Sequence, residues 1–336
     1  MTEISTTLLS VTFLLTFLLS AGLVYVAIAL GRRFVMLDLP GERQSHSQPT
    51  LTGGGIGIVS SLVLSSLVFT LQGLVAQDWV FIVLPGVVAL SVIGWMDDRR
   101  PVSARFRLFV QLAVSFALIG SLVFAGKLNG WLIPLLAGVA IVWIMNVYNF
   151  MDGSHGMAGF QGVFAGLLLA LIFLFEKQPL LLIPSLLIAA SCAGFLPFNM
   201  PNPRIFMGDA GSVPLGFAIS ALLVMGLTVG ALSFPAALLV LAVFLVDGSL
   251  TLLKRVIRGE QWYTAHKQHV YQRLIRQGWP HSRVLLLYQA VNIILVVPVV
   301  ILVTMYPVYA WPLTGMSFLL LAAGWYIASR KLEVRN

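Results

Sequence analysis

The 336-residue sequence has few charged residues, since only 10% are Asp, Glu, Lys or Arg whereas 59% are hydrophobic. Soluble domains carry about one quarter charged residues, and a surface in water could not be covered with so few. The shortage excludes a soluble enzyme, a disordered chain and a nucleic-acid-binding domain. It indicates a polytopic membrane protein of the all-α class, because apolar chain segments cross a bilayer as helices.

Cysteine is equally scarce, because Cys192 is the only one in the sequence. One cysteine excludes a disulfide within the chain, and its apolar surroundings give no indication of a cysteine-based metal site. The net charge of +8 would usually suggest an acidic partner. In a membrane protein it is more typical of basic residues placed in cytoplasmic loops.

Apolar runs of about 20 residues, the length that crosses a bilayer, recur along the chain and predict about eleven spans. No basic residue precedes the first run and Arg32 and Arg33 follow it, so we expect a span with its N-terminus outside rather than a signal peptide. Alternation then places every Lys and Arg on the cytoplasmic side except Lys127 and Lys177, which supports the count. The predicted spans are 5–30, 52–76, 79–96, 106–125, 131–149, 157–175, 180–198, 212–230, 232–250, 284–304 and 309–328.

We predict a single transmembrane domain over residues 1–336, with its active site on the cytoplasmic face. The longest polar segment mixes basic and aromatic residues, which suits a segment lying on an anionic inner leaflet. The segments expected on the cytoplasmic face are about 31–51, 97–105, 150–156, 199–211 and 251–283.

Acidic residues number only twelve, and several stand where a span meets the cytoplasm. A carboxylate at the edge of a span is costly and is by default a functional-site hypothesis. Ion pairs with neighbouring basic residues are the alternative, for Asp98 with Arg99 and Arg100 and for Asp247 with Lys254 and Arg255. Converging acids repel one another unless a cation lies among them, and Mg²⁺, which takes one or two carboxylates with waters and phosphates, fits better than zinc. The acids at these boundaries are Asp97, Asp98, Asp152, Asp209 and Asp247.

The segment 146–156 carries polar groups at the end of an apolar span. Asn146, Asn149 and Asp152 are about one helical turn apart and therefore share one face. Amides in an apolar setting need partners, which leaves two interpretations: hydrogen bonds between helices, or a polar strip leading to a ligand. Gly153 and Gly156 allow the backbone to turn beyond the strip.

The segment 203–212 places Asp209 in a Gly-flanked loop directly before a span. Gly211 and Ser212 are expected to open that span with free backbone N–H groups, which attract anions at a helix N-terminus. Phe206 stands beside the loop, where a nucleobase could stack on it. Plain anchoring at the membrane interface is the alternative for this phenylalanine.

Glycines cluster at 53–57 in a pattern that superficially contains a dinucleotide-binding fingerprint. No βαβ unit surrounds the cluster, so a Rossmann interpretation is discounted. The glycines are expected to let helices pack closely. A phosphate bound at the start of the second span is a further interpretation.

Two of the five histidines, His266 and His269, stand three residues apart in the long basic segment. A zinc pair would lack further ligands, so phosphate binding together with Lys267 is favoured. His281, further along the chain, is interpreted as a solvated loop residue.

Taken together and in this order, these segments resemble the polyprenyl-phosphate N-acetylhexosamine-1-phosphate transferase superfamily (glycosyltransferase family 4), in its O-antigen initiating branch. The resemblance runs from Asp38 to about Arg283. The sequence departs from the family at His155, where a second acid of an Asp-Gly-x-Asp-Gly motif is usual, and at Thr52, where Arg often precedes the glycines. The motifs that carry the resemblance are Asp97-Asp98, Asn146/Asn149/Asp152-Gly153, Phe206 to Ser212, His266/His269, and Ser45-His46, Pro49-Thr50 and Gly53-Gly54-Gly55.

The resemblance implies that a polyprenyl phosphate, undecaprenyl phosphate above all, attacks the sugar-linked phosphorus of a UDP-N-acetylhexosamine, with UMP leaving. It implies Mg²⁺ as the cofactor, with Mn²⁺ as an alternative. The implied catalytic residues are Asp97, Asp98 and Asp209, with Asp152 joining them around the metal. The implied substrate contacts are Asn146, Asn149, Asp152, His155, Arg204, Phe206, His266 and His269.

As the first membrane step of O-antigen or another cell-surface polysaccharide, this reaction would belong to the bacterial cytoplasmic membrane. A homodimer is considered as the assembly, and no nucleic acid is expected as a partner. UDP-GlcNAc, UDP-GalNAc and 6-deoxy N-acetyl sugars are equally compatible with the sequence. The main alternative is a secondary transporter of a phosphorylated solute, although transporters place key acids near the bilayer midplane. An enzyme like the phospho-MurNAc-pentapeptide transferases, and an inactive scaffold, are further alternatives.

Overall fold

The computed structural model describes residues 5–33, 37–38, 50–261 and 266–333, and the chain is helical almost throughout. The all-α prediction is confirmed. In the described residues the strands are β1 (Leu37–Asp38) and β2 (Thr50–Leu51), which form a two-stranded antiparallel ribbon. The Ser45-His46 and Pro49 positions of the resemblance lie outside the described residues.

The helices follow one another along the chain, and two π-helical turns extend them: η1 runs directly into α3, and η2 joins α12 to α13. Before the acidic cluster they are α1 (Thr6–Arg33), α2 (Gly55–Leu71), the π-helix η1 (Trp79–Val83), α3 (Leu84–Arg99), α4 (Ala104–Phe124), α5 (Leu132–Phe150), α6 (Met157–Phe175) and α7 (Pro179–Asn199). After it they are α8 (Asp209–Thr228), α9 (Phe234–Val240), α10 (Ala242–Ile257), α11 (Val270–Arg276), α12 (His281–Val291), the π-helix η2 (Asn292–Val296), α13 (Val297–Met305), the 3₁₀-helix η3 (Pro307–Tyr309) and α14 (Ala310–Glu333).

Nine helical segments of the described chain are long and apolar enough to cross a membrane, which confirms a multi-pass membrane protein. Two predicted spans have another form. Helix α2 has only 17 residues, and the predicted span 232–250 is broken into α9 and α10, which meet at 76°. The count of about eleven and the orientation in the membrane stay predictions.

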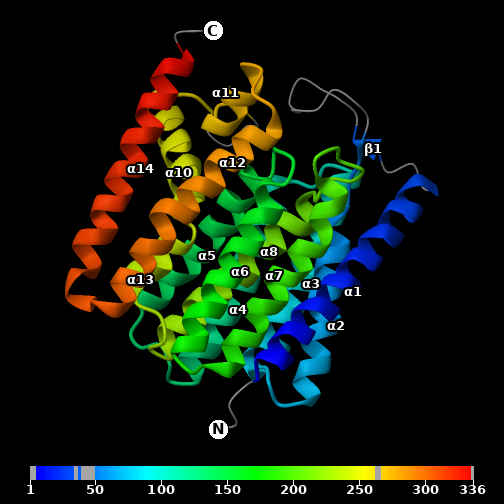
Figure 1. The fold of residues 1–336 in the computed structure, drawn as a ribbon, viewed down its shortest axis with the longest axis vertical. Coiled ribbons are helices and arrows are strands. Elements are labelled where there is room, and N and C mark those ends of the chain that lie inside the picture. The colour runs from blue at the N-terminus through cyan, green and yellow to red at the C-terminus, as the bar shows by residue number, and fades with distance from the viewer. Residues whose placement is uncertain (1–4, 34–36, 39–49, 262–265, 334–336) are drawn as a thin grey trace.

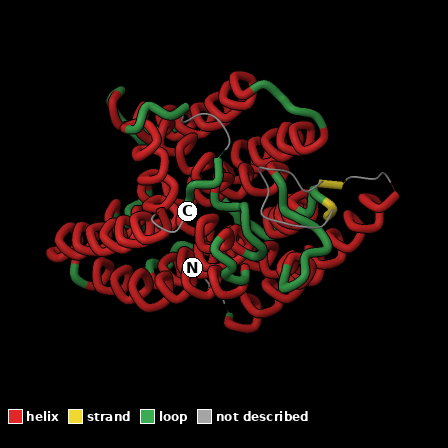
Figure 2. The backbone as a smooth tube through the Cα atoms, turned by 90° about the horizontal axis from the view of Figure 1, so that it is seen from above, coloured by secondary structure: helices red, strands yellow, loops and turns green. Residues whose placement is uncertain are grey.

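The helices form a bundle with α6, α7 and α8 at its centre and with α1 and α14 at opposite edges (Figure 1). The central helices are also the most buried: 89% of the apolar stretch of α8 is buried in the bundle, whereas only 17% of the apolar stretch that contains α14 is buried. Figure 2 shows loops gathered over the middle of the bundle, at the end where α14 finishes. This end carries Asp97, Asp98, Asp152 and Asp209.

Two glycines bring α2 and α3 into backbone contact with the start of α8. A Cβ on Gly55 would overlap the backbone of Gly211, and a Cβ on Gly94 would overlap the backbone of Asp209. The Ser91 hydroxyl also donates to the Ala210 carbonyl (2.8 Å). Because Gly94 lies one turn before the end of α3, this close packing sets Asp97 and Asp98 beside the first residues of α8.

The glycine cluster also pairs with the loop that leads into α8. The N–H groups of Gly54 and Gly55 donate to the carbonyls of Phe206 (2.8 Å) and Met207 (2.9 Å), and the Phe206 N–H donates to the Leu51 carbonyl (2.7 Å). The prediction of close packing is confirmed. The phosphate interpretation is wrong for Gly54 and Gly55, because their N–H groups already have backbone acceptors.

Candidate active site

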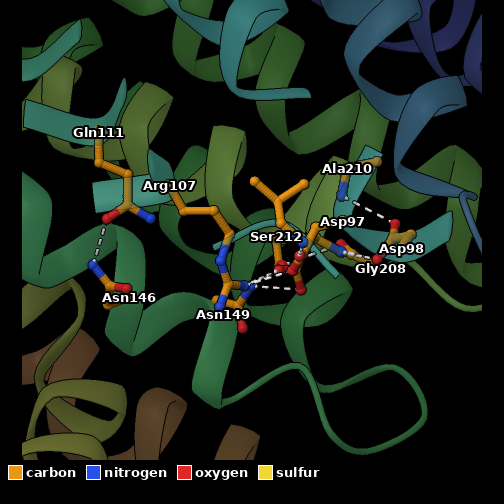
Figure 3. Close-up of polar contacts among 11 residues, drawn as sticks. Asp97, Asp98, Arg107, Gln111, Asn146, Asn149, Gly208, Ala210 and Ser212 are labelled. Carbon is orange, nitrogen blue, oxygen red and sulfur yellow. Dashed lines mark hydrogen bonds and ion pairs between the residues drawn. The ribbon is translucent and has the colours of Figure 1, made fainter. Parts of the chain in front are cut away.

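The predicted convergence of acidic residues is present at the end of the bundle that carries the loops. Asp97 and Asp98 stand on the last turn of α3, Asp152 follows α5, and Asp209 is the first residue of α8. Figure 3 shows the acids of α3 beside the start of α8, with Arg107 of α4 reaching toward them. The four acids divide into two pairs that make different contacts.

Asp98 and Asp152 bind the backbone at the start of α8. The Asp98 carboxylate accepts the N–H groups of Asp209 (3.0 Å) and Ala210 (3.3 Å), and Asp152 accepts the N–H of Gly208. An anion was expected at this helix N-terminus, and carboxylates of the chain itself fill that role. Burial raises the pKa of Asp152 well above its ordinary value, and the nearby carboxylates of Asp209 and Asp98 raise it further.

Asp97 and Asp209 form the second pair, and Arg107 joins them. Arg107 Nη1 lies 2.6 Å from Asp97 Oδ2 and 3.1 Å from Asp209 Oδ2. The Val102 N–H donates to Asp97 Oδ1 (2.6 Å) and the Asn149 amide donates to Asp209 Oδ1 (2.8 Å). The two carboxyl groups are within hydrogen-bonding reach of each other. One guanidinium thus partly balances two carboxylates that face the same space.

The two asparagines of the polar strip have different roles. The Asn146 amide donates to Gln111 Oε1 of α4 and to the Val142 carbonyl (2.8 Å each). Asn146 therefore makes a hydrogen bond between helices, as the first interpretation predicts. The Asn149 amide instead donates to Asp209, as expected if the polar strip leads to a binding site. Arg107 and Gln111 were not among the predicted site residues, although their spacing of one turn on an apolar span is the same signal that marked the asparagines.

A stack of rings lies on the other side of the loop that holds Asp152. His155 stacks on His281 with centroids 3.8 Å apart and planes 4° from parallel, and its centroid is 5.9 Å from that of Phe206. The Ser154 hydroxyl is 3.0 Å from His281 Nδ1. The prediction that His281 is a solvated loop residue is wrong, because it is the first residue of α12 and packs on His155.

Arg204 stands apart from these groups. Its side chain is exposed, and its N–H donates to the Phe198 carbonyl (2.8 Å) in the loop between α7 and α8. The substrate contact implied for Arg204 stays a prediction.

His266 and His269 lie side by side before α11, with ring centroids 5.0 Å apart. His269 is buried and packs between Phe150 (6.2 Å) and Tyr271 (5.9 Å). Burial, together with the neighbouring His269 and Arg255, lowers the pKa of His266 to about 3. The imidazole of His266 is therefore neutral at physiological pH.

Asp247 does not form the ion pair considered for it. Arg255 pairs with Glu260 (3.1 Å), and Lys254 donates to Ser329 (2.6 Å). The Asp247 carboxylate instead accepts hydrogen bonds from several helices, the shortest from Tyr288 (2.6 Å).

The donor set at Asp97 and Asp209 fits a hard divalent cation. Within the described residues no three His, Cys, Asp or Glu side chains are grouped so as to hold a metal ion. A set of four acids around one ion is therefore not what the structure presents, since Asp98 and Asp152 contact the backbone. Two carboxylates, with waters and substrate phosphates completing the shell, are the usual ligands of Mg²⁺.

Apolar helices long enough to cross a membrane, with carboxylates and an arginine gathered at one end, define a multi-pass membrane protein with a charged site at that end. A sequence model of the family described as Glycosyl transferase family 4 matches residues 80–227, the part that contains Asp97, Arg107, Asn149 and Asp209. The chain belongs to this family, within the polyprenyl-phosphate hexosamine-1-phosphate transferase superfamily, and it is a transferase.

Particular relatives cover most of the chain. It is 28% identical over 278 residues to the probable undecaprenyl-phosphate N-acetylglucosaminyl 1-phosphate transferase of Bacillus subtilis (79% of this chain, 77% of the relative). It is 28% identical over 310 residues to the decaprenyl-phosphate N-acetylglucosaminephosphotransferase of Mycobacterium leprae (80% and 76%). It is 30% identical over 260 residues to a phospho-N-acetylmuramoyl-pentapeptide-transferase of Synechococcus sp. (71% and 72%). The resemblance to the superfamily is confirmed, whereas the O-antigen initiating branch stays a prediction.

Proposed function

We propose that the protein transfers N-acetylhexosamine-1-phosphate from a UDP-sugar to undecaprenyl phosphate and releases UMP. An oxygen of the lipid phosphate bonds to the sugar-bearing phosphorus while the bond from that phosphorus to the bridging oxygen breaks. The bridging oxygen leaves on UMP. The observation that carries the proposal is the pair Asp97 and Asp209, joined by Arg107 at the end of the membrane helices.

Phosphoryl transfer depends mainly on positioning and on neutralising charge. Asp97 and Asp209 would hold Mg²⁺, with Mn²⁺ as a second candidate, and the ion would neutralise the diphosphate. Asn149 keeps the Asp209 carboxylate turned toward Asp97 through its 2.8 Å hydrogen bond. Arg107 is placed to contact the phosphate oxygens, and the lipid phosphate needs no strong base because its second pKa is near ~6.

The remaining predicted residues have supporting roles in this proposal. Asp98 holds the N-terminus of α8, so that Asp209 keeps its position. Asp152, His155 and Phe206 surround the loop where we place the nucleoside, with Phe206 offering a face for the base. His266 and His269, beside basic residues, would contact phosphate oxygens. Asn146 supports the site through Gln111.

We place this reaction in the bacterial cytoplasmic membrane, as the first membrane step of a cell-surface polysaccharide such as O-antigen. The names of the relatives support a polyprenyl phosphate as the acceptor and a phosphorylated N-acetylglucosamine as the group transferred. They also keep an enzyme like the phospho-MurNAc-pentapeptide transferases as a second candidate. A transporter is disfavoured, because the carboxylates gather at one end of the bundle rather than at its middle.

The decisive experiment offers the purified protein undecaprenyl phosphate, Mg²⁺ and a panel of UDP-N-acetyl sugars, with the lipid product identified by mass. We expect UMP release and one sugar-diphosphate lipid, both abolished by chelation of the metal. Asp209→Asn should lower UMP release about a hundredfold or more while expression is unchanged. Substantial Mg²⁺-dependent UMP release by Asp209→Asn would overturn the assignment.

A matched control is Asp78→Asn. Asp78 stands at the opposite end of the η1–α3 segment and pairs with Lys127 (2.6 Å), so its substitution should leave UMP release unchanged. In sealed vesicles, accumulation of solute without a lipid product would support the transporter instead.

A further inference from the structure

A buried carboxylate outside the acidic cluster connects several helices. Asp247 lies on α10 and its side chain is almost completely buried. Its Oδ2 accepts the Tyr288 hydroxyl of α12 (2.6 Å). Its Oδ1 accepts the Val270 N–H of α11 (3.0 Å), the Trp325 indole N–H of α14 (3.2 Å) and the Thr251 hydroxyl (3.1 Å).

These partners satisfy the carboxylate within the protein. An ionised carboxylate has about four lone-pair sites, and a buried one is stable only when donors occupy them. Because Asp247 is almost completely buried and its donors are all protein groups, it does not face a metal or a substrate. Its effect must therefore pass through the groups that it holds.

The group held most directly is the start of α11. Val270 is the first residue of this helix, and His269, which precedes it, places Nδ1 3.7 Å from Asp247 Oδ1. The next residue, Tyr271, donates its hydroxyl to the Phe150 carbonyl (2.8 Å) at the end of α5. A Cβ on Gly153 would overlap that hydroxyl, so α11 is in close contact with the turn that carries Asp152.

We propose that Asp247 is a positioning residue, which fixes His269 and the start of α11 against the 150–153 turn and so completes the phosphate-binding side of the active site. This inference rests on the proposed function. It predicts that breaking the link between Asp247 and α11 weakens binding of the nucleotide sugar through His269, while the acids that hold the metal are untouched.

Val270→Pro breaks this link with little other change. Proline lacks the N–H that Asp247 accepts, and it is tolerated at the first position of a helix. His269 already has the extended conformation that a following proline requires, with φ −59° and ψ 149°. Asp247→Ala is the larger perturbation, and Asp247→Asn, which keeps an oxygen for the Val270 N–H, should restore most of the lost affinity.

The readout is the Kd for UDP-N-acetylglucosamine in the presence of Mg²⁺, measured by calorimetry on purified protein, with UMP release followed in parallel. Val270→Pro should raise Kd on the order of tenfold. In a His269→Ala background it should raise Kd by less than about twofold more, because the two substitutions disrupt the same interaction with the ligand. kcat should change less than KM, as expected for lost ground-state binding.

An unchanged Kd in Val270→Pro, or effects that multiply with those of His269→Ala, would overturn the positioning role. If Asp247→Ala does not yield monodisperse protein, the Val270→Pro cycle decides alone. Failure of the proposed function looks different, because the wild-type protein would then bind no UDP-sugar and release no UMP.

Discussion

Adjacent aspartates with different tasks give the sharpest prediction. Asp97 and Asp98 are neighbours on α3, yet Asp97 faces Arg107 and Asp209 whereas Asp98 binds the backbone of α8. We therefore expect Asp97→Asn to impair chemistry and Asp98→Asn to impair stability. Both substitutions keep the side-chain shape and remove the charge.

The magnitudes follow from the contacts. In Asp98→Asn one oxygen still accepts an N–H, but the amide NH₂ would face the second N–H, which costs about 1.5–3 kcal/mol for a lost hydrogen bond to a charged group. Loss of the charge at a helix N-terminus adds about 0.3–1 kcal/mol. Asp97→Asn weakens a half-exposed ion pair to Arg107, which is worth only about 1 kcal/mol or less.

Thermal unfolding in detergent and UMP release measure the two effects separately. Asp98→Asn should lower the unfolding midpoint by several degrees and keep part of the activity. Asp97→Asn should unfold within about two degrees of the wild type but release UMP at least about a hundredfold more slowly. An Asp98→Asn protein with wild-type stability and no activity would refute this division and make Asp98 a direct participant.

Two further predictions concern the loop before α8 and the histidine segment. Gly208 has φ +72°, and a Cβ there would overlap Asp98 Oδ2 and Thr52 Oγ1. Gly208→Ala should therefore abolish UMP release. Gly230→Ala, with the same φ and open space around it, should only lower the free energy of unfolding, by about 1–2 kcal/mol of backbone strain; equal effects of the two substitutions on UMP release would contradict this. Because the pKa of His266 is lowered to about 3, its imidazole is neutral from pH 6 to 8. His266→Asn should therefore raise the Kd for UDP-sugar without changing how Kd depends on pH. If the substitution removes an inflection of Kd in this pH range, His266 is charged and the prediction is wrong.

Much of the fold could be predicted because membrane helices are encoded locally. A run of about 20 apolar residues must become helical in lipid, and the acids at the ends of such runs were found by their rarity alone. The bend between α9 and α10 and the shortness of α2 were missed. Hydropathy over 232–250 is continuous, and the break after Val240 depends on packing against other helices.

The candidate site could be predicted as a set of residues but not as a set of contacts. Asp97 and Asp98 are indistinguishable in sequence, and their tasks differ only because Gly94 brings one face of α3 onto α8. Arg107 belongs to another helix, and only its spacing of one turn from Gln111 on an apolar span indicates it in the sequence. An ion pair of Asp247 with its basic sequence neighbours is one alternative from the sequence, whereas the partners in the structure include Tyr288 and Trp325, which are distant in the chain.

The backbone contacts at Gly55 and Gly94 have a consequence for how the enzyme can diversify. Where two main chains touch, no residue larger than glycine can be accepted without moving a whole helix. The ends of α2, α3 and α8 therefore form a frame in which none of these helices can change at its contact independently of the others. Under the proposed function, changes in sugar or nucleotide preference have to arise around this frame, in the ring stack at His155 and in the α11 segment, where side chains rather than main chains make the contacts.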